Sequence, residues 1–318
     1  MTQHENIAYT SKTSTESMPY TSRSPDEAKI WQRDVRLRLF NLLKMTDLVT
    51  GDTPFPFFAK TLSTKKEEGY VVHEIEINAT PGRRMNIVLT VPADRNGPFP
   101  AIVLVSGHGG SRHTSYEADN GYHRIGHILA KKGYVTASTE VGQHEVYEKD
   151  RTLVGERLWS LMRCVDFLAA QKEVDARRIG SAGISLGGEM VMWLGAMDQR
   201  VRANIVSGFL TKMDQMEENH CMCWKFSGLR ELVEFTDIYS LIAPRALLCQ
   251  NGLDEHLSQF PPSLALEAIQ DIGTIYADFE KQQNVTLIAH KGGHEFHVPS
   301  VIGFFEQYLN DRNNVAQP

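Results

Sequence analysis

The feature that most constrains this chain is the hexapeptide Gly-Ile-Ser-Leu-Gly-Gly at residues 183–188, which contains Ser185. The segment directly before it, 178–182, is short and consists mainly of small residues, which favours a central strand that ends in a crowded turn. Apolar residues after it recur at helical spacing, at Met190, Val191, Leu194 and Met197. The sequence therefore predicts a strand, a sharp turn and a helix in this order, with the glycines at 183 and 187 leaving room for the turn.

A serine on such a turn is held in a strained backbone conformation, with its hydroxyl exposed at the edge of a sheet beside the first N–H groups of a helix. Helix N-termini favour negative charge that develops during a reaction. The motif also arises by chance about 0.1 times in a chain of this composition. The strand–turn–helix context favours a catalytic nucleophile at Ser185.

A nucleophilic serine on this type of turn is followed along the chain by an acid and then by a histidine, each after its own strand. Asp254 follows the predicted strand 246–250, and His294 follows the predicted strand 285–289. We expect His294 to act as the general base and Asp254 to orient its ring. The neighbouring Glu255 is the alternative acid.

Two more histidines, His290 and His297, flank the same loop. Taken alone, any one histidine is more often a surface or core residue than a catalytic base. His294 is preferred because it follows a Gly-Gly pair, which permits a close approach of the backbone.

Backbone N–H groups that could stabilise an oxyanion are predicted in two places. The first is the N–H of Leu186, directly after the serine. The second lies in Ser-Gly-His-Gly-Gly at 106–110, where the glycines let backbone donors turn inward. In this loop the N–H of His108 is the preferred second oxyanion donor, and the N–H of Gly109 is the alternative. The ring of His108 is expected only to pack against its neighbours.

Strands and helices alternate along the rest of the chain. An antiparallel edge hairpin is predicted at 70–77 and 85–91, and a continuously apolar central strand at 101–105. Further strands are predicted at 134–138 and 203–207, and helices at 119–132, 151–171, 263–280 and 298–310. This alternation predicts an α/β fold with a mostly parallel, doubly wound sheet flanked by helices.

The N-terminal part is predicted to form a tail and then a helix. Residues 1–24 are polar and rich in Ser and Thr, so we expect them to be disordered. Ser24, Pro25 and Glu27 match a helix start with a capping box. The helix is expected to run to about Met45.

One domain is predicted over 25–312, followed by a short tail at 313–318. Within it, the segment 208–236 is long for a connection between two strands of such a sheet. Its aromatic and methionine residues are typical of a lid over an apolar pocket, so Trp224 and Phe226 are predicted to bind substrate. Core packing is the alternative explanation for the same residues.

The same segment contains His220, Cys221 and Cys223, whose side chains are soft metal ligands. No fourth residue has the spacing of a structural zinc site, so neither a metal nor another cofactor is expected. We expect these three side chains to pack beneath the segment.

Composition restricts the partners and the compartment. A net charge of −6, with no basic run, argues against nucleic acid as the main partner. No stretch has the length of a membrane span or the apolar core of a secretory signal, so no membrane association is expected and a cytoplasmic location is the default. The four cysteines show no disulfide framework, as in a reducing compartment. The sequence leaves homo-oligomer formation open.

With these motifs the chain resembles α/β-hydrolases of the dienelactone hydrolase-like branch, and it is especially similar to bacterial proteins grouped with acetyl xylan esterases. The resemblance covers roughly residues 25–310. It rests on S-G-H-G-G, V-D-A-R-R-I-G-S-A-G-I-S-L-G-G, W-L-G-A-M-D-Q-R-V, H-C-M-C-W and A-P-R-A-L-L-C-Q-N-G-L-D. It implies a serine esterase with a Ser185–Asp254–His294 triad. Two residues depart from the pattern, since Ser106 occurs where relatives often have His, and true dienelactone hydrolases have Cys in place of Ser185.

The expected reaction is the hydrolysis of carboxylic esters of small or acetylated molecules through an acyl-enzyme intermediate. The expected partner is therefore a small-molecule ester. Cleavage of amide or carbon–carbon bonds by the same triad is an alternative. A second alternative is a binding protein that has a hydrolase fold but no catalytic activity. The presence of all three catalytic groups argues against this alternative.

Overall fold

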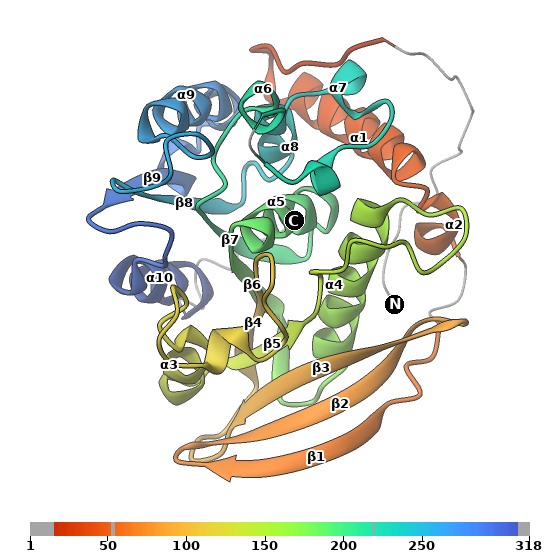
Figure 1. Cartoon of the computed structure of the whole chain (residues 1–318), viewed down its shortest axis with the longest axis vertical. Helices are drawn as coiled ribbons and strands as arrows, with labels where there is room; N and C mark the ends of the chain where they lie inside the picture. The colour runs from red at the N-terminus through yellow and green to blue at the C-terminus, as the bar shows by residue number, and fades with distance from the viewer. Residues whose placement is uncertain (1–15, 52–54, 219, 311–318) are drawn as a thin grey trace.

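The computed structural model describes residues 16–51, 55–218 and 220–310, which form an α/β fold around one sheet (Figure 1). The nine strands of this described part lie in the order β1-β2-β3-β5-β4-β6-β7-β8-β9. In this order, the neighbours among β1, β2, β3 and β5 pair in antiparallel fashion. The neighbours among β5, β4, β6, β7, β8 and β9 pair in parallel. The strands are β1 (Lys60–Glu67), β2 (Tyr70–Thr80), β3 (Arg83–Pro92), β4 (Phe99–Val105), β5 (Val135–Thr139), β6 (Val174–Ile184), β7 (Val201–Ser207), β8 (Ala246–Gly252) and β9 (Val285–His290).

Helices cover both faces of the sheet. Helices α3 and α10 belong to the hydrophobic core on one face, whereas α1, α4, α5, α8 and α9 belong to the core on the other. The helices are α1 (Pro25–Leu42), α2 (Thr46–Val49), α3 (Ile125–Lys132), α4 (Leu153–Ala169), α5 (Leu186–Met197), α6 (Met213–Met216), α7 (Leu229–Leu232), α8 (Phe235–Ser240), α9 (Pro262–Asp278) and α10 (Val298–Phe305).

Strand β4 is covered on both sides. Val103 and Val105 point into the core that contains α4 and α5, whereas Ile102 and Leu104 point into the core that contains α3 and α10. Every residue of the strand is buried. Its continuous apolar run is therefore that of a central strand between two helical layers, as predicted.

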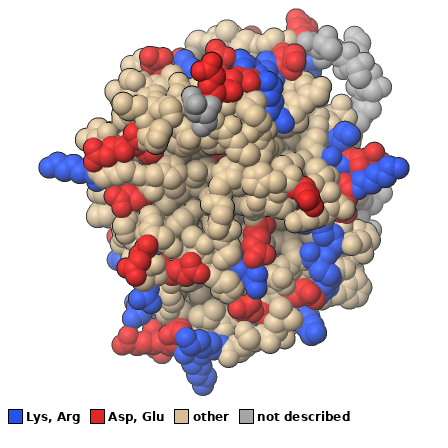
Figure 2. Space-filling view, in the orientation of Figure 1, with Lys and Arg blue, Asp and Glu red and all other residues tan. Residues whose placement is uncertain are grey.

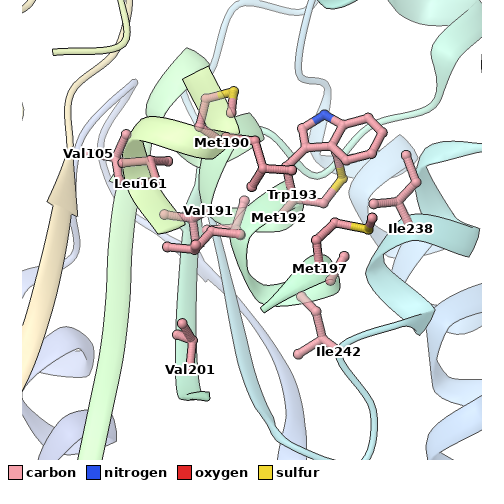
Figure 3. Packing of buried hydrophobic residues seen from close by; sticks show 14 of the residues in the cluster. Val105, Leu161, Met190, Val191, Met192, Trp193, Met197, Val201, Ile238 and Ile242 are labelled. Carbon is pink, nitrogen blue, oxygen red and sulfur yellow. The ribbon is translucent and has the colours of Figure 1, made fainter. Parts of the chain in front are cut away.

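Helix α5 lies in the middle of the larger core and is buried on every side. Figure 3 shows its methionines and Trp193 packed among residues of neighbouring elements, including Leu161 of α4, Val201 of β7 and Ile238 of α8. A helix that is apolar all round is held by close packing in every direction. This packing fixes the position of Ser185, the residue directly before the helix.

The mostly parallel, doubly wound sheet predicted from the sequence is confirmed, and the predicted strands lie within a few residues of their expected bounds. The sequence does not predict β1, because Lys-Thr-Leu-Ser-Thr-Lys-Lys-Glu is almost entirely exposed and has no apolar alternation. Since β1 pairs with β2 at the margin of the sheet, the hairpin of β2 and β3 is not itself the edge. The lysines of β1 are typical of an edge strand that avoids pairing with other chains.

Helix α1 has the predicted capping box and ends a little before the expected Met45. The predicted disorder of residues 1–24 is wrong for 18–23, which are docked on the domain, while residues 1–15 and the predicted tail at 313–318 lie outside the described residues. The hydroxyl of Tyr20 donates to the carboxylate of Asp278 at 2.6 Å. The Tyr20 ring also packs edge-on against Trp31, with ring centroids 4.8 Å apart. Composition does not reveal this docking because, apart from the packing of the Tyr20 ring, it depends largely on hydrogen bonds between a polar stretch and distant residues.

Charges of both signs are mixed on the face shown in Figure 2, and the centre of this face is largely neutral. This face therefore has no broad region of one sign that would attract a polyanion. Within the described ranges, no helix combines the length and the apolar character that crossing a bilayer requires.

The docking of the N-terminal segment predicts a stability effect for Tyr20→Phe. Removing the hydroxyl takes away a hydrogen bond to a carboxylate, so the free energy of unfolding should fall by about 1–2 kcal/mol. Urea unfolding measures this, with Tyr147→Phe as the control because Tyr147 is 62% exposed. Equal stabilities for the two variants would contradict a structural role for this docking.

Candidate active site

Ser185 lies on the sharp turn between β6 and α5, with φ 62° and ψ −127°, a conformation that L-residues rarely adopt. Its N–H donates to the carbonyl of Ser207 at 3.0 Å. A Cβ on Gly183 would overlap the carbonyl of Gly187, and a Cβ on Gly187 would overlap the carbonyl of Val105. The turn predicted from the motif is therefore present, and only glycine fits at these two neighbouring positions.

His294 and Glu255 form the second part of the site. Nδ1 of His294 lies 2.9 Å from Oε2 and 3.2 Å from Oε1 of Glu255. The Glu255 side chain is only 1% exposed and that of His294 is 40% exposed, so a buried carboxylate lies behind an accessible ring. Phe260 stacks on this ring, with centroids 5.4 Å apart. A carboxylate on Nδ1 holds the proton there and leaves Nε2 as the basic nitrogen.

The predicted pairing of Asp254 with His294 is wrong, because the adjacent Glu255 makes this contact. Residues 253 and 254 form a turn after β8, in which the N–H of Asp254 donates to the carbonyl of Gly292 at 2.9 Å and its side chain is exposed. The chain then returns toward the interior at Glu255, the alternative acid of the sequence analysis. The longer side chain of glutamate reaches the imidazole from this position.

The dipeptide Ser207-Gly208 at the end of β7 brings Ser185 and His294 to the same place. The carbonyl of Ser207 accepts the N–H of Ser185. A Cβ on Gly208 would lie 2.6 Å from Cε1 and 2.7 Å from Nδ1 of His294, so the imidazole rests directly on this glycine. Gly208 also has a φ of 59°, which favours glycine. Ser207, the last residue of β7, and Gly208, the next residue, therefore position both the serine and the histidine.

Leu186 directly follows the serine, and the loop that contains His108 touches it. The N–H of Leu186 belongs to the first residue of α5 and has no acceptor within the helix. On the other side, a Cβ on Gly107 would lie 3.0 Å from Cβ of Ser185, so the loop that continues into His108 touches the serine. The N–H of Gly107 donates to the hydroxyl of Tyr122 at 2.5 Å, and burial raises the pKa of this tyrosine to about 12. Tyr122 was not found from the sequence because no motif marks it.

The other two histidines of the loop are engaged elsewhere. The rings of His290 and His297 stack on each other, with centroids 5.5 Å apart. Nδ1 of His297 also lies 2.9 Å from Oγ of Ser300 on α10. These contacts agree with the preference for His294 as the candidate base.

The segment 208–236 is packed into the core more deeply than a lid would be. Trp224 is completely buried, in edge contact with Phe235 at a centroid distance of 5.2 Å. A side chain without exposed surface cannot line an open pocket, so the prediction that Trp224 binds substrate is wrong and the core-packing alternative holds for it. Phe226 is half-buried and borders a mostly charged surface hollow that contains no residue of the site described above. Its lining is Glu217, Lys225, Phe226, Ser227, Arg230 and Glu231.

A group of potential metal ligands lies beside the site. One ligand atom from each of His108, His144, Cys221 and Cys223 lies within 4.8 Å of the others. Burial lowers the pKa of His108 to about 4, so its ring is neutral. Burial raises the pKa of the Cys223 thiol to about 12, and a hydrogen bond from Arg157 opposes that rise. Sequence reasoning found the two cysteines but neither histidine as a ligand, since those lie on separate loops.

Comparisons with known proteins agree with this architecture. No family model matches the sequence. The chain is 24% identical to the "Putative hydrolase YtaP" of Bacillus subtilis over 293 residues, which cover 81% of this chain and 92% of the relative.

Solved structures of esterases superpose on most of the chain. A putative acetyl xylan esterase from Bacteroides fragilis matches with a TM-score of 0.70 and 18% identity, over 87% of this chain and 79% of that chain. A glucuronoyl esterase from Solibacter usitatus matches with a TM-score of 0.69 and 16% identity, over 93% of this chain and 98% of that chain. These likenesses show that the chain has the α/β-hydrolase fold.

The burial of Trp224 predicts a loss of stability for Trp224→Ala. A large cavity in the core should lower the free energy of unfolding by about 3–5 kcal/mol. Phe226→Ala is the matched control, since it truncates a half-buried aromatic residue of the same segment and should cost less. Urea unfolding followed by circular dichroism compares the two, and a Trp224→Ala variant no less stable than Phe226→Ala would show that this indole is not part of the core.

Proposed function

We propose that this chain is a carboxylic ester hydrolase in which Ser185 is the nucleophile, His294 the general base and Glu255 the acid that orients the base. The observation that carries the proposal is the strained turn at Ser185 beside a histidine whose Nδ1 is held by a buried carboxylate. Backbone strain of this kind costs about 1–3 kcal/mol and is found mainly at functional sites. A serine with only a structural role would not need it.

The proposed reaction has two halves. In the first, Nε2 of His294 takes the hydroxyl proton of Ser185 while Oγ attacks the carbonyl carbon of the ester. The N–H groups of Leu186 and His108 stabilise the negative charge on the carbonyl oxygen. As the carbon–oxygen bond to the alcohol breaks, His294 returns the proton to the leaving oxygen.

In the second half, water replaces the alcohol. His294 takes a proton from the water as its oxygen attacks the acyl carbon, and it returns this proton to Oγ of Ser185 when the acid leaves. Glu255 stabilises the protonated imidazole in both halves. No other group needs to change its protonation state in this scheme.

The comparisons support an ester as the substrate, since the solved structures above are named acetyl xylan esterase and glucuronoyl esterase. Small or acetylated esters that contain a carbohydrate are the class that these names favour, with the carbohydrate as the alcohol in acetyl xylan and as the acyl group in a glucuronoyl ester. Leu253 and Leu257 flank Glu255 in the sequence and are 53% and 71% exposed. We infer that these leucines, in place of the buried Trp224, offer apolar contacts to the substrate.

The proposed nucleophile is tested by Ser185→Ala. This variant should stay folded and lose about 10⁴–10⁶-fold in kcat for an acetate ester, because the acyl-enzyme can no longer form. The measurement is the release of a chromogenic alcohol. A variant that kept more than a tenth of the wild-type rate would exclude Ser185 as the nucleophile.

The proposed acid is tested by comparing Glu255→Gln with Asp254→Asn. Glu255→Gln removes the charge beside His294 and should lower kcat by about 10³–10⁴-fold, whereas Asp254→Asn changes an exposed side chain and should leave kcat near wild type. The two neighbouring amide substitutions control for each other. The opposite order of effects would restore Asp254 as the orienting acid.

A further inference from the structure

Three segments that are far apart in the sequence bring two histidines and two cysteines together beside the candidate active site. His108 lies on the loop after β4, His144 on the loop after β5, and Cys221 and Cys223 on the segment after β7. All three strands belong to the parallel part of the sheet, so their carboxyl ends emerge at one edge. The fold therefore gathers these four side chains at the edge where Ser185 also lies.

The spacing within this group is close to that of a tetrahedral metal site. Nε2 of His108 lies 3.2 Å from Sγ of Cys223, and Nε2 of His144 lies 3.4 Å from Sγ of Cys221. With metal–nitrogen bonds of about 2.0 Å and metal–sulfur bonds of about 2.3 Å, neighbouring ligand atoms around tetrahedral zinc are about 3.3–3.8 Å apart. The largest separation in the group, 4.8 Å, exceeds this range by about 1 Å, which small side-chain rotations would remove.

Arg157 of α4 supports the group from the interior. It is completely buried, and its Nη1 donates to Sγ of Cys223 at 3.4 Å. Its Nη2 donates to the carbonyl of Gln143, the residue before His144. A guanidinium N–H that donates to a cysteine sulfur orients this sulfur from outside the group of ligands. One buried side chain therefore contacts a sulfur ligand and also fixes the backbone beside a nitrogen ligand.

We propose that His108, His144, Cys221 and Cys223 bind one zinc ion in a tetrahedral site. Two thiolates balance the charge of Zn²⁺, and two sulfurs with two imidazole nitrogens are a ligand set that this ion prefers. Four protein ligands leave no open position on the ion. The site is therefore structural and takes no part in the proposed ester hydrolysis.

The ion would join the segment 208–236 to the loop that carries an oxyanion donor. The ring of His108 binds the metal in this proposal, while its backbone N–H is the proposed oxyanion donor. Cys221 and Cys223 would hold the segment against this loop, in addition to the buried contacts of Trp224. Loss of the ion should leave Ser185, His294 and Glu255 in place and should loosen the segment.

No metal was expected from the sequence because the four ligands do not share one short motif. Cys221 and Cys223 are the only local pair in the site, and the histidines come from two other loops. Their proximity depends on the order of β4, β5 and β7 in the sheet. It becomes visible only once the described residues are folded.

The test is the metal content of the full chain, purified under reducing conditions without a metal-binding tag. We expect one zinc ion per chain by mass spectrometry of the elements. After removal of zinc by a chelator, titration with Co²⁺ should saturate at one ion per chain. The bound cobalt should show the intense visible bands of tetrahedral coordination and a near-ultraviolet thiolate-to-cobalt band. Less than a tenth of an equivalent of either metal, or an octahedral cobalt spectrum, would overturn the proposal.

Variants at the exposed ligands locate the ion. His144→Ala and Cys221→Ser should each weaken Co²⁺ binding at least about 100-fold. His256→Ala changes another exposed histidine and should bind like wild type. Ser185→Ala should also keep full binding, so a failure of the hydrolase proposal and a failure of the zinc proposal remain distinguishable. Wild-type affinity in the ligand variants, or a disulfide between Cys221 and Cys223 that persists in the reduced, metal-free chain, would contradict the site.

Discussion

The candidate active site depends on the close contact of backbone segments around Ser185. A side chain at Gly183 or Gly187 would overlap a carbonyl oxygen, Gly107 touches the serine, and Gly208 touches His294. Backbone atoms in a packed sheet cannot shift to relieve an overlap, as the ends of flexible side chains can. The nucleophile, the oxyanion loop and the base are therefore positioned by the sheet and by the enclosed helix α5, which is the rigid support that a preorganised site requires.

Much of the fold could be predicted because local patterns encode it. Strand β4 is continuously apolar, α5 has apolar residues at helical spacing, and the glycines around Ser185 mark the turn between strand and helix. The choice between Asp254 and Glu255 could not be made in the same way. The two acids are adjacent, and the turn after β8 decides which one faces His294.

Other features depend on contacts between distant segments, which no local pattern contains. Trp224 fits a pocket and a core equally well by residue type, and its complete burial beside Phe235 shows that it belongs to the core. Tyr20 lies in a polar stretch, yet it forms a hydrogen bond with Asp278, which is 258 positions later in the sequence. His144 meets the two cysteines because β5 and β7 end at the same edge of the sheet.

The central claim is that Ser185 is an activated nucleophile. The most direct measurement is to treat the folded chain with a fluorophosphonate, which reacts covalently with activated serines, and to map the adduct by mass spectrometry. If Ser185 is activated, each folded chain acquires one adduct, on the peptide that contains Ser185, and heat-denatured chain acquires none. An unreactive folded chain, or an adduct on another serine, would contradict it.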